Sequence, residues 1–187
     1  MRESRNRSLS FSRRRILELA AAAAFVGGSA AAVVRTRGYT LRRGQVLASL
    51  CAWQFVVVEH AARRIAASDG ASGPPIPTAD ELEVAGFVDT WLAGLDDRVR
   101  RDFGRFLAYI EHLAPIGVGL GSRFTRLAPR DQDRVLASAE VSSSGLIRAG
   151  FEGLKALVFM GYYRDPRTWR IVGYDGPFVA RPPGGWW

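Results

Sequence analysis

The stretch "SGLIRAGFEGLKALVFMGYYR" (residues 144–164) decides the fold class, because its apolar residues recur at helical spacing. These residues are Ile147, Phe151, Leu154, Val158 and Tyr162. Each follows the last after three or four positions, which is the spacing of one face of an α-helix. The serines of residues 142–144 can cap the start. The stretch therefore predicts a long amphipathic helix whose apolar face lies in a protein core.

Two segments nearer the N-terminus also have a helical pattern. One runs from residue 40 or 44 to about residue 67, and the loop of residues 68–77 follows it. The next opens with "TADE" (residues 78–81), in which Thr78 and Glu81 have the spacing of a capping box. Its apolar positions are Leu82, Val88, Trp91, Leu92 and Leu95. Both segments are expected to pack as helices.

The middle of the chain predicts two more helices. One starts at Asp96-Asp97 and carries an apolar stripe that we expect Pro115 to end. After the Gly-rich loop of residues 117–127, Pro129 suits the first position of a helix of about residues 129–140. No alternating strand pattern stands out. The expected fold class is all-α: a small irregular helical bundle with an extended C-terminal tail, preceded by an N-terminal signal segment.

The first 35 residues have the order of an export signal. A basic head precedes an apolar run of residues 16–34, as in a signal peptide. Within "SRRRIL" (residues 12–17), the residues Arg13, Arg14, Ile16 and Leu17 resemble the twin-arginine (Tat) motif. The division that follows is a signal or anchor in residues 1–35, a helical domain in residues 40–178, and a tail in residues 179–187.

Two other interpretations of this segment stay open. The apolar run nearly reaches the length of about 20 residues that a membrane helix needs, although Glu18 and the many alanines disfavour a stable span. The second interpretation is a disordered basic tail. Small residues at 30–32 offer a cleavage site, and both a cleaved signal and a retained anchor are compatible with the sequence. The Tat interpretation predicts a location in the periplasm or on the periplasmic face of the inner membrane.

The net charge of +8 lies entirely in the N-terminal segment. Residues 1–43 contain ten arginines and two glutamates, so the other 144 residues balance 16 basic against 16 acidic side chains. A nucleic-acid-binding domain needs a basic face on its folded part. The charge balance therefore argues against nucleic acid as a partner.

The sequence offers few groups for catalysis. Its two histidines occur in Glu59-His60 and Glu111-His112, and adjacent helical residues point in different directions, so each pair supplies one inward ligand at best. The single cysteine, Cys51, lies in an apolar run and is expected to be buried. We therefore expect no catalytic, metal-binding or cofactor-binding residue in this chain.

Three segments in order carry a family resemblance: "RRDFGRFLAYIEHLAP" (100–115), "SRFTRLAPRDQDRVL" (122–136) and "FEGLKALVFMGYYRDPRTWRIVGYDGP" (151–177). Together they resemble the gluconate 2-dehydrogenase subunit 3 family, the small Tat-signalled subunits of flavin-dependent dehydrogenases of the glucose-methanol-choline (GMC) type. The closing segment keeps Tyr163, Pro166, Gly173, Tyr174 and Pro177 of the family pattern. The resemblance covers about residues 40–178.

The resemblance implies a non-catalytic partner of a large subunit. In the family, the large subunit holds FAD and oxidises the substrate, and electrons often pass to a cytochrome c subunit. The small subunit supplies the export signal and helps the large one to mature, as a chaperone does. The implied partners of this chain are therefore a large FAD-containing GMC-type dehydrogenase subunit, the Tat translocase and a cytochrome c subunit.

The C-terminal aromatic residues are the candidates for partner binding. Protein interfaces are enriched in Tyr, Trp and Arg, and these residues also dominate binding energy. The candidates are Tyr162, Tyr163, Trp169, Tyr174, Asp175, Gly176, Pro177, Trp186 and Trp187. The alternative is that they are buried in the domain's own core. This alternative is strongest for Tyr162, because it belongs to the apolar helical stripe.

Two other functions are compatible with the sequence. The first is a stand-alone exported enzyme whose metal is held by Glu59, His60, Glu111 and His112. The second is a structural envelope protein held in the membrane by residues 16–34.

Overall fold

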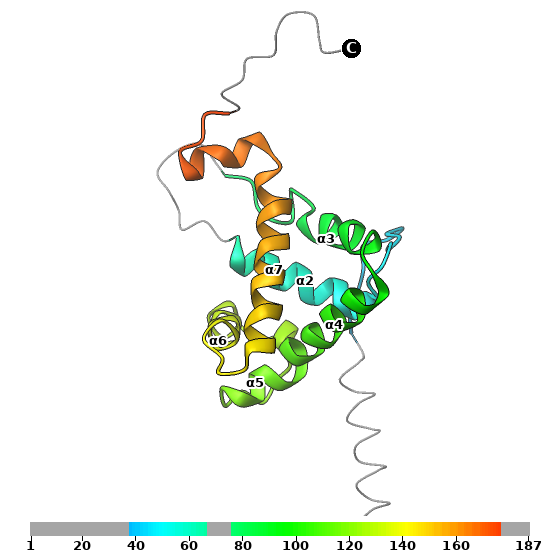
Figure 1. Ribbon diagram of the computed structural model, residues 1–187, viewed down its shortest axis with the longest axis vertical. Helices are drawn as coiled ribbons and strands as arrows, with labels where there is room; N and C mark the ends of the chain where they lie inside the picture. Colours follow the sequence, from blue (N-terminus) through cyan, green and yellow to red (C-terminus); the bar gives the residue numbers. More distant parts are fainter. Residues whose placement is uncertain (1–37, 67–75, 177–187) are drawn as a thin grey trace, which may run out of the picture. The chain divides into compact units, whose positions relative to one another are not determined.

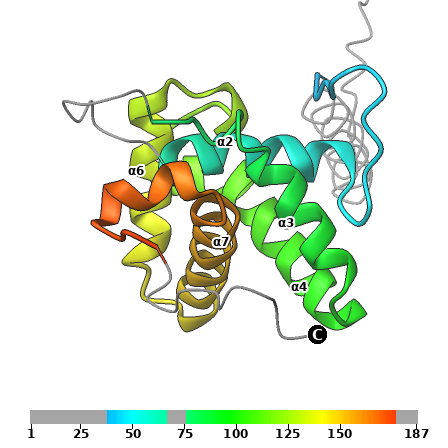
Figure 2. The same cartoon turned by 90° about the horizontal axis from the view of Figure 1, so that it is seen from above.

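The computed structural model describes residues 38–66 and 76–176. The chain divides into two compact units, Met1–Gly38 and Tyr39–Trp187, and all described residues except Gly38 belong to the second. The described residues form six α-helices, two 3-10 helices and one π-helical turn, and they contain no strand (Figures 1 and 2). The predicted all-α class is thus confirmed. The signal residues Arg13, Arg14, Ile16 and Leu17 lie outside the described residues.

Helix α7 (Gly145–Tyr163) crosses α2 and lies between α6 and α3 (Figures 1 and 2). Four of its five predicted apolar residues, Phe151, Leu154, Val158 and Tyr162, are at most 4% exposed, and Ile147 is partly buried against the core. The helix contacts α2, α3, α4 and α6, so each of these elements places part of its apolar face against it. The stripe identified in the sequence is therefore part of the core.

Helix α2 (Ala52–Ile65) begins later than the sequence predicted. The residues before it form an irregular segment, here called the strap (residues 39–50). A turn at Gly44, whose φ is +83°, breaks the helical pattern because the left-handed region suits glycine. The expected helix start at residue 40 or 44 was therefore wrong.

Helix α3 (Val84–Ala93) follows a series of turns. The predicted capping box forms: the Thr78 N–H donates to Glu81, and the Glu81 N–H donates to the Thr78 hydroxyl, both at 3.2 Å. The helix nevertheless starts only at Val84, because Glu83 adopts a left-handed φ of 50°. The capping box thus closes the turn before the helix rather than its first turn.

Helix α4 (Asp97–Ala108) starts where the sequence predicted, with the Asp96 carboxylate accepting the Arg98 N–H at 2.7 Å. It continues into the π-helical turn η1 (Tyr109–Leu113) and the short α5 (Ala114–Gly117). Pro115 therefore does not end the helix. It lies in the first turn of α5, where the N–H that proline lacks has no helical partner to lose.

The remaining elements are η2 (Phe124–Arg126) and α6 (Pro129–Glu140), and α6 has the predicted bounds. Val135, Leu136 and Ala139 face the core, and α6 contacts α2 and α7. Among the described residues, no helix has the length and apolar character that crossing a bilayer requires.

Candidate partner-binding surface

The end of α7 is followed at once by the 3-10 helix η3 (Pro166–Val172). The Asp165 carboxylate accepts the Arg167 backbone N–H at 2.9 Å, and Pro166 takes the first helical position. The Arg167 guanidinium also binds both Asp165 oxygens, from Nε at 2.9 Å and from Nη2 at 2.8 Å. The predicted short helix after Asp165-Pro166 is therefore confirmed, and one carboxylate holds its start.

Two side chains of η3 fasten it to the last turn of α7. The buried Thr168 hydroxyl donates to the carbonyls of Asp165 at 2.8 Å and Tyr162 at 3.3 Å. The Trp169 indole N–H donates to the Tyr163 carbonyl at 2.8 Å. Because helix ends leave carbonyls without intrahelical donors, these bonds satisfy groups that would otherwise need water. The position of η3 is thus fixed by the backbone of α7.

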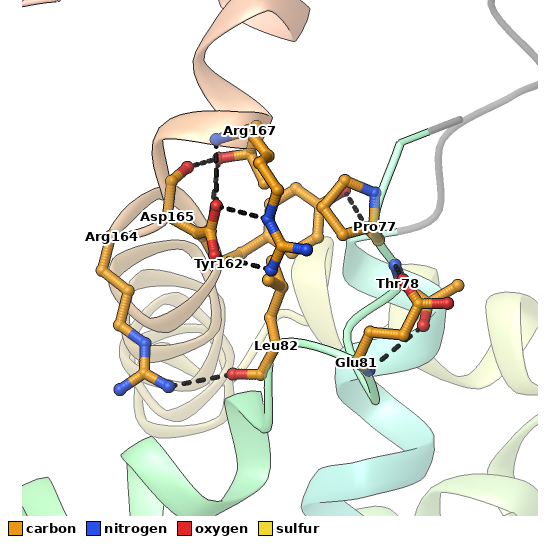
Figure 3. A network of polar contacts seen from close by, with 9 residues as sticks. Pro77, Thr78, Glu81, Leu82, Tyr162, Arg164, Asp165 and Arg167 are labelled. Carbon is orange, nitrogen blue, oxygen red and sulfur yellow. Dashed lines mark hydrogen bonds and ion pairs between the residues drawn. The ribbon is translucent and has the colours of Figure 1, made fainter. Parts of the chain in front are cut away.

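A second set of contacts ties the end of α7 to the turns before α3 (Figure 3). The Tyr162 hydroxyl donates to the Pro77 carbonyl at 2.9 Å, and Arg164 Nη2 donates to the Leu82 carbonyl at 2.9 Å. Both acceptors lie more than 80 residues away in the sequence. These bonds hold η3 and the start of α3 in one arrangement.

Asp165 and Tyr162 keep their usual charge near neutral pH. The hydrogen bonds from Arg167 lower the pKa of Asp165 to about 2, so it stays a carboxylate. Burial raises the pKa of Tyr162, so its hydroxyl stays protonated and donates. A general acid or base works best when its pKa lies near the operating pH. The geometry here therefore fits structural anchoring better than proton transfer.

The outer side of η3 presents apolar side chains to solvent. Ile171, Val172 and Tyr174, here called the η3 surface, are 39%, 58% and 38% exposed. The Tyr174 ring packs edge-on against Trp169 with centroids 5.0 Å apart. Gly173, with a φ of +64°, allows the turn that brings Tyr174 back toward Trp169. The η3 surface is thus exposed but held in place by its own packing.

The predicted partner-binding residues fall into four groups. Tyr162 is buried in the core at 2% exposure, so its ring is not available on the surface. Tyr163, Trp169 and Gly176 are half-buried, and Tyr174 and Asp175 are exposed. Pro177, Trp186 and Trp187 lie outside the described residues. Of the described candidates, Tyr174 and Asp175 are the most accessible.

A second exposed apolar region lies on α3 and was not predicted as a binding site. It is a groove of about 390 Å³ lined by Phe87, Thr90, Trp91, Gly94 and Leu95, here called the α3 groove. Trp91 is 45% exposed and packs on Phe87 with centroids 5.6 Å apart.

The end of α7 reaches this groove through Arg164. The Arg164 guanidinium carbon lies 5.2 Å from the centroid of the Phe87 ring. Tryptophan, tyrosine and arginine are the residues that most often dominate binding energy at interfaces. The spacing of Phe87 and Trp91, four positions apart on a helix, is the sequence signal that indicates this patch.

The histidine and glutamate side chains have different contact partners. The buried Glu111 carboxylate accepts the Thr125 hydroxyl at 2.7 Å and the Thr125 N–H at 3.1 Å. His60 Nδ1 lies 2.9 Å from Gln132 Nε2, and the His112 ring lies 6.2 Å from the Trp53 ring. Within residues 38–66 and 76–176, no three His, Cys, Asp or Glu side chains form a group able to hold a metal ion.

Cys51 is exposed, so its expected burial was wrong. It is the N-cap of α2, and the Gln54 side chain accepts its backbone N–H at 3.0 Å. The apolar run around it belongs partly to the strap and partly to the first turn of α2. The apolar neighbours were therefore a poor guide, because a helix boundary passes through the run.

Comparison with protein families matches residues 52–176 to the family described as gluconate 2-dehydrogenase subunit 3. The matched range runs from the first turn of α2 to the turn after η3, and so includes the α3 groove and the η3 surface. Searches of curated proteins and of solved structures find no significant match. On a family match that spans about two thirds of its length, this chain belongs to the gluconate 2-dehydrogenase subunit 3 family.

Proposed function

We propose that this chain is the non-catalytic small subunit and export escort of an FAD-dependent GMC-type dehydrogenase. Its role is to bind the large subunit, assist its maturation and supply the Tat signal in residues 1–35 for the complex. The assembled enzyme then works in the periplasm or on the periplasmic face of the inner membrane, with a cytochrome c subunit as the expected electron acceptor. FAD belongs to the large subunit.

The family membership is the observation that carries this proposal, since the family is named for a subunit of a dehydrogenase complex. The surface chemistry supports it. The η3 surface and the α3 groove expose aromatic and aliphatic side chains on elements that the Tyr162 and Arg164 hydrogen bonds hold together. A rigid, partly apolar surface binds a partner with less loss of side-chain entropy than a mobile one.

Two exposed valines allow a matched test of the η3 surface. Val172 on η3 is 58% exposed and Val141, after α6, is 79% exposed. In pull-downs of the large subunit by the full chain, Val172→Asp should weaken capture by about tenfold or more, because a charge would be buried without a partner. Val141→Asp should leave capture unchanged. Equal capture by both variants would reject the η3 surface as the binding site.

The export and cofactor parts of the proposal have separate tests. Arg13→Lys together with Arg14→Lys should retain both this chain and its large subunit in the cytoplasm. The chain purified alone should show no flavin absorbance, and the co-purified complex should show it. Stoichiometric flavin in the isolated chain would contradict the assignment of FAD to the partner. Unchanged export of the double variant would contradict the Tat signal.

A further inference from the structure

The strap (residues 39–50) has little regular structure of its own but is held at both ends. It contains one turn, closed by the Gln45 N–H donating to the Arg42 carbonyl at 3.1 Å. Leu41 and Leu47 pack against the core as partly buried side chains, and Leu50 is buried. Between these residues Arg42 and Arg43 remain exposed. The strap therefore depends on the rest of the domain for its conformation.

The C-terminal end of the strap is held by a single buried carboxylate of α3. Asp89 is 3% exposed, and its oxygens accept the backbone N–H groups of Ala48 at 2.6 Å, Ser49 at 2.9 Å and Leu50 at 2.6 Å. A buried carboxylate is costly unless donors surround it, and here the strap supplies all three hydrogen bonds. Asp89 and the strap thus stabilise each other, because the carboxylate needs these donors and the three N–H groups need this acceptor.

The N-terminal end of the strap is held by a second buried carboxylate, on the π turn η1. The Tyr39 hydroxyl donates to Glu111 at 2.6 Å, and Glu111 is fully buried. The Arg123 guanidinium carbon lies 4.1 Å from the centroid of the Tyr39 ring. Burial and the bond to Glu111 raise the pKa of Tyr39, so the hydroxyl keeps its proton. Glu111 also has Thr125 as a donor and therefore does not depend on the strap alone.

We propose that the strap is a folding-dependent latch, which is held in place only when α3, with Asp89, and η1, with Glu111, have both packed into the domain. The strap residues lie 39 to 72 positions from the two carboxylates that hold them, so local folding cannot form these bonds. The latch would let the export machinery distinguish a folded chain from an unfolded one at the segment next to the signal. This last step rests on the proposed function.

Hydrogen exchange of the full chain, followed by mass spectrometry, tests the latch. In Asp89→Asn, the amide of Asn replaces one acceptor with a donor, so the amides of residues 48–50 should exchange about tenfold faster or more. Trypsin should cleave faster after Arg42 and Arg43. The amides of α6 and α7 should keep their protection. Unchanged exchange at residues 48–50, or equal loss throughout α6 and α7, would overturn the latch.

Two further variants complete the test: one is a control, and the other tests the N-terminal end of the strap. Asp97→Asn removes an exposed carboxylate on α4 whose ion pair is local, with Arg100, and should leave the strap protected. Tyr39→Phe removes the bond to Glu111 while Thr125 still satisfies that carboxylate, so the domain should fold and the N-terminal half of the strap should exchange faster. Full protection of the strap in Tyr39→Phe would reject the N-terminal anchor.

Export of each variant is measured in the cells that produce it. Asp89→Asn should be exported several-fold less than Asp97→Asn, although both variants keep protected α6 and α7 amides. Equal export with a released strap would overturn the reporting role. The Arg13→Lys and Arg14→Lys variant separates this outcome from the proposed function, because it tests the signal without altering the strap.

Discussion

Two glycines of α7 give opposite predictions for the same substitution. A Cβ added at Gly150 would lie 2.6 Å from Cγ and 3.0 Å from Cε2 of the Phe106 ring on α4. A Cβ added at Gly153 would meet no atom within 4 Å. Both residues are in the interior of one helix, so their effects on helix propensity are similar. The difference between the two variants therefore measures how closely α4 and α7 approach.

The magnitudes follow from two opposing effects. Replacing a glycine in a helix interior by alanine stabilises by about 0.5–1 kcal/mol. Overpacking a well-filled core costs about 1–3 kcal/mol, and Phe106 has little room to move because it is only 8% exposed. Gly153→Ala should thus gain about 0.5–1 kcal/mol, and Gly150→Ala should lose about 1 kcal/mol after its propensity gain.

Urea and thermal unfolding of the full chain measure this difference. A gap of about 2 kcal/mol corresponds to melting temperatures roughly 4–8 °C apart for a domain of this size. In a Phe106→Leu background the smaller side chain removes the clash, so the cost of Gly150→Ala should shrink. If Gly150→Ala proved as stabilising as Gly153→Ala, the close packing of α7 on α4 would be refuted.

Three other predictions concern the core and the end of α7. Tyr162→Phe leaves the Pro77 carbonyl without its donor and should cost about 1–3 kcal/mol in urea unfolding; an unchanged midpoint would exclude this bond. Asp165→Ala removes the N-cap of η3, so exchange of η3 amides should quicken while α6 amides stay protected, and uniform exchange would contradict it. Burial lowers the pKa of His60 below 6.5, so the unfolded chain binds more protons than the folded one just below that pH. The free energy of unfolding should therefore decrease as the pH falls below about 6.5, less so in His60→Gln, and an identical pH profile in this variant would refute it.

The helices that the sequence predicted well are those whose ends are set by neighbouring residues. The start of α4 depends on Asp96 and the residue two positions later. Helix α6 starts at Pro129, and η3 starts at Asp165-Pro166. In each case the capping group and the backbone it serves lie within a few positions, so the sequence alone contains the information.

The strap and the π turn could not be predicted in the same way. The strap stays out of α2 because Asp89 accepts its N–H groups from about 40 positions away, in competition with the helical pattern of residues 46–61. The sequence predicts that Pro115 ends a helix, but η1 shifts the hydrogen-bond register so that Pro115 lies in the first turn of α5. Both features depend on tertiary contacts that no local pattern contains.

On the candidate surface, too, the sequence alone does not decide whether a single side chain is buried or exposed. Tyr162 and Tyr174 are both aromatic residues of one C-terminal segment, yet one is 2% and the other 38% exposed. The helical stripe that ends at Tyr162 indicated its burial, whereas nothing periodic governs the position of Tyr174 after Gly173. The position of Tyr174 is set instead by the Trp169 ring and by its own N–H, which donates to the Trp169 carbonyl at 3.0 Å. A surface that is apolar, exposed and held by its own bonds has the properties that a docking site needs, and composition alone could not distinguish it from the core beside it.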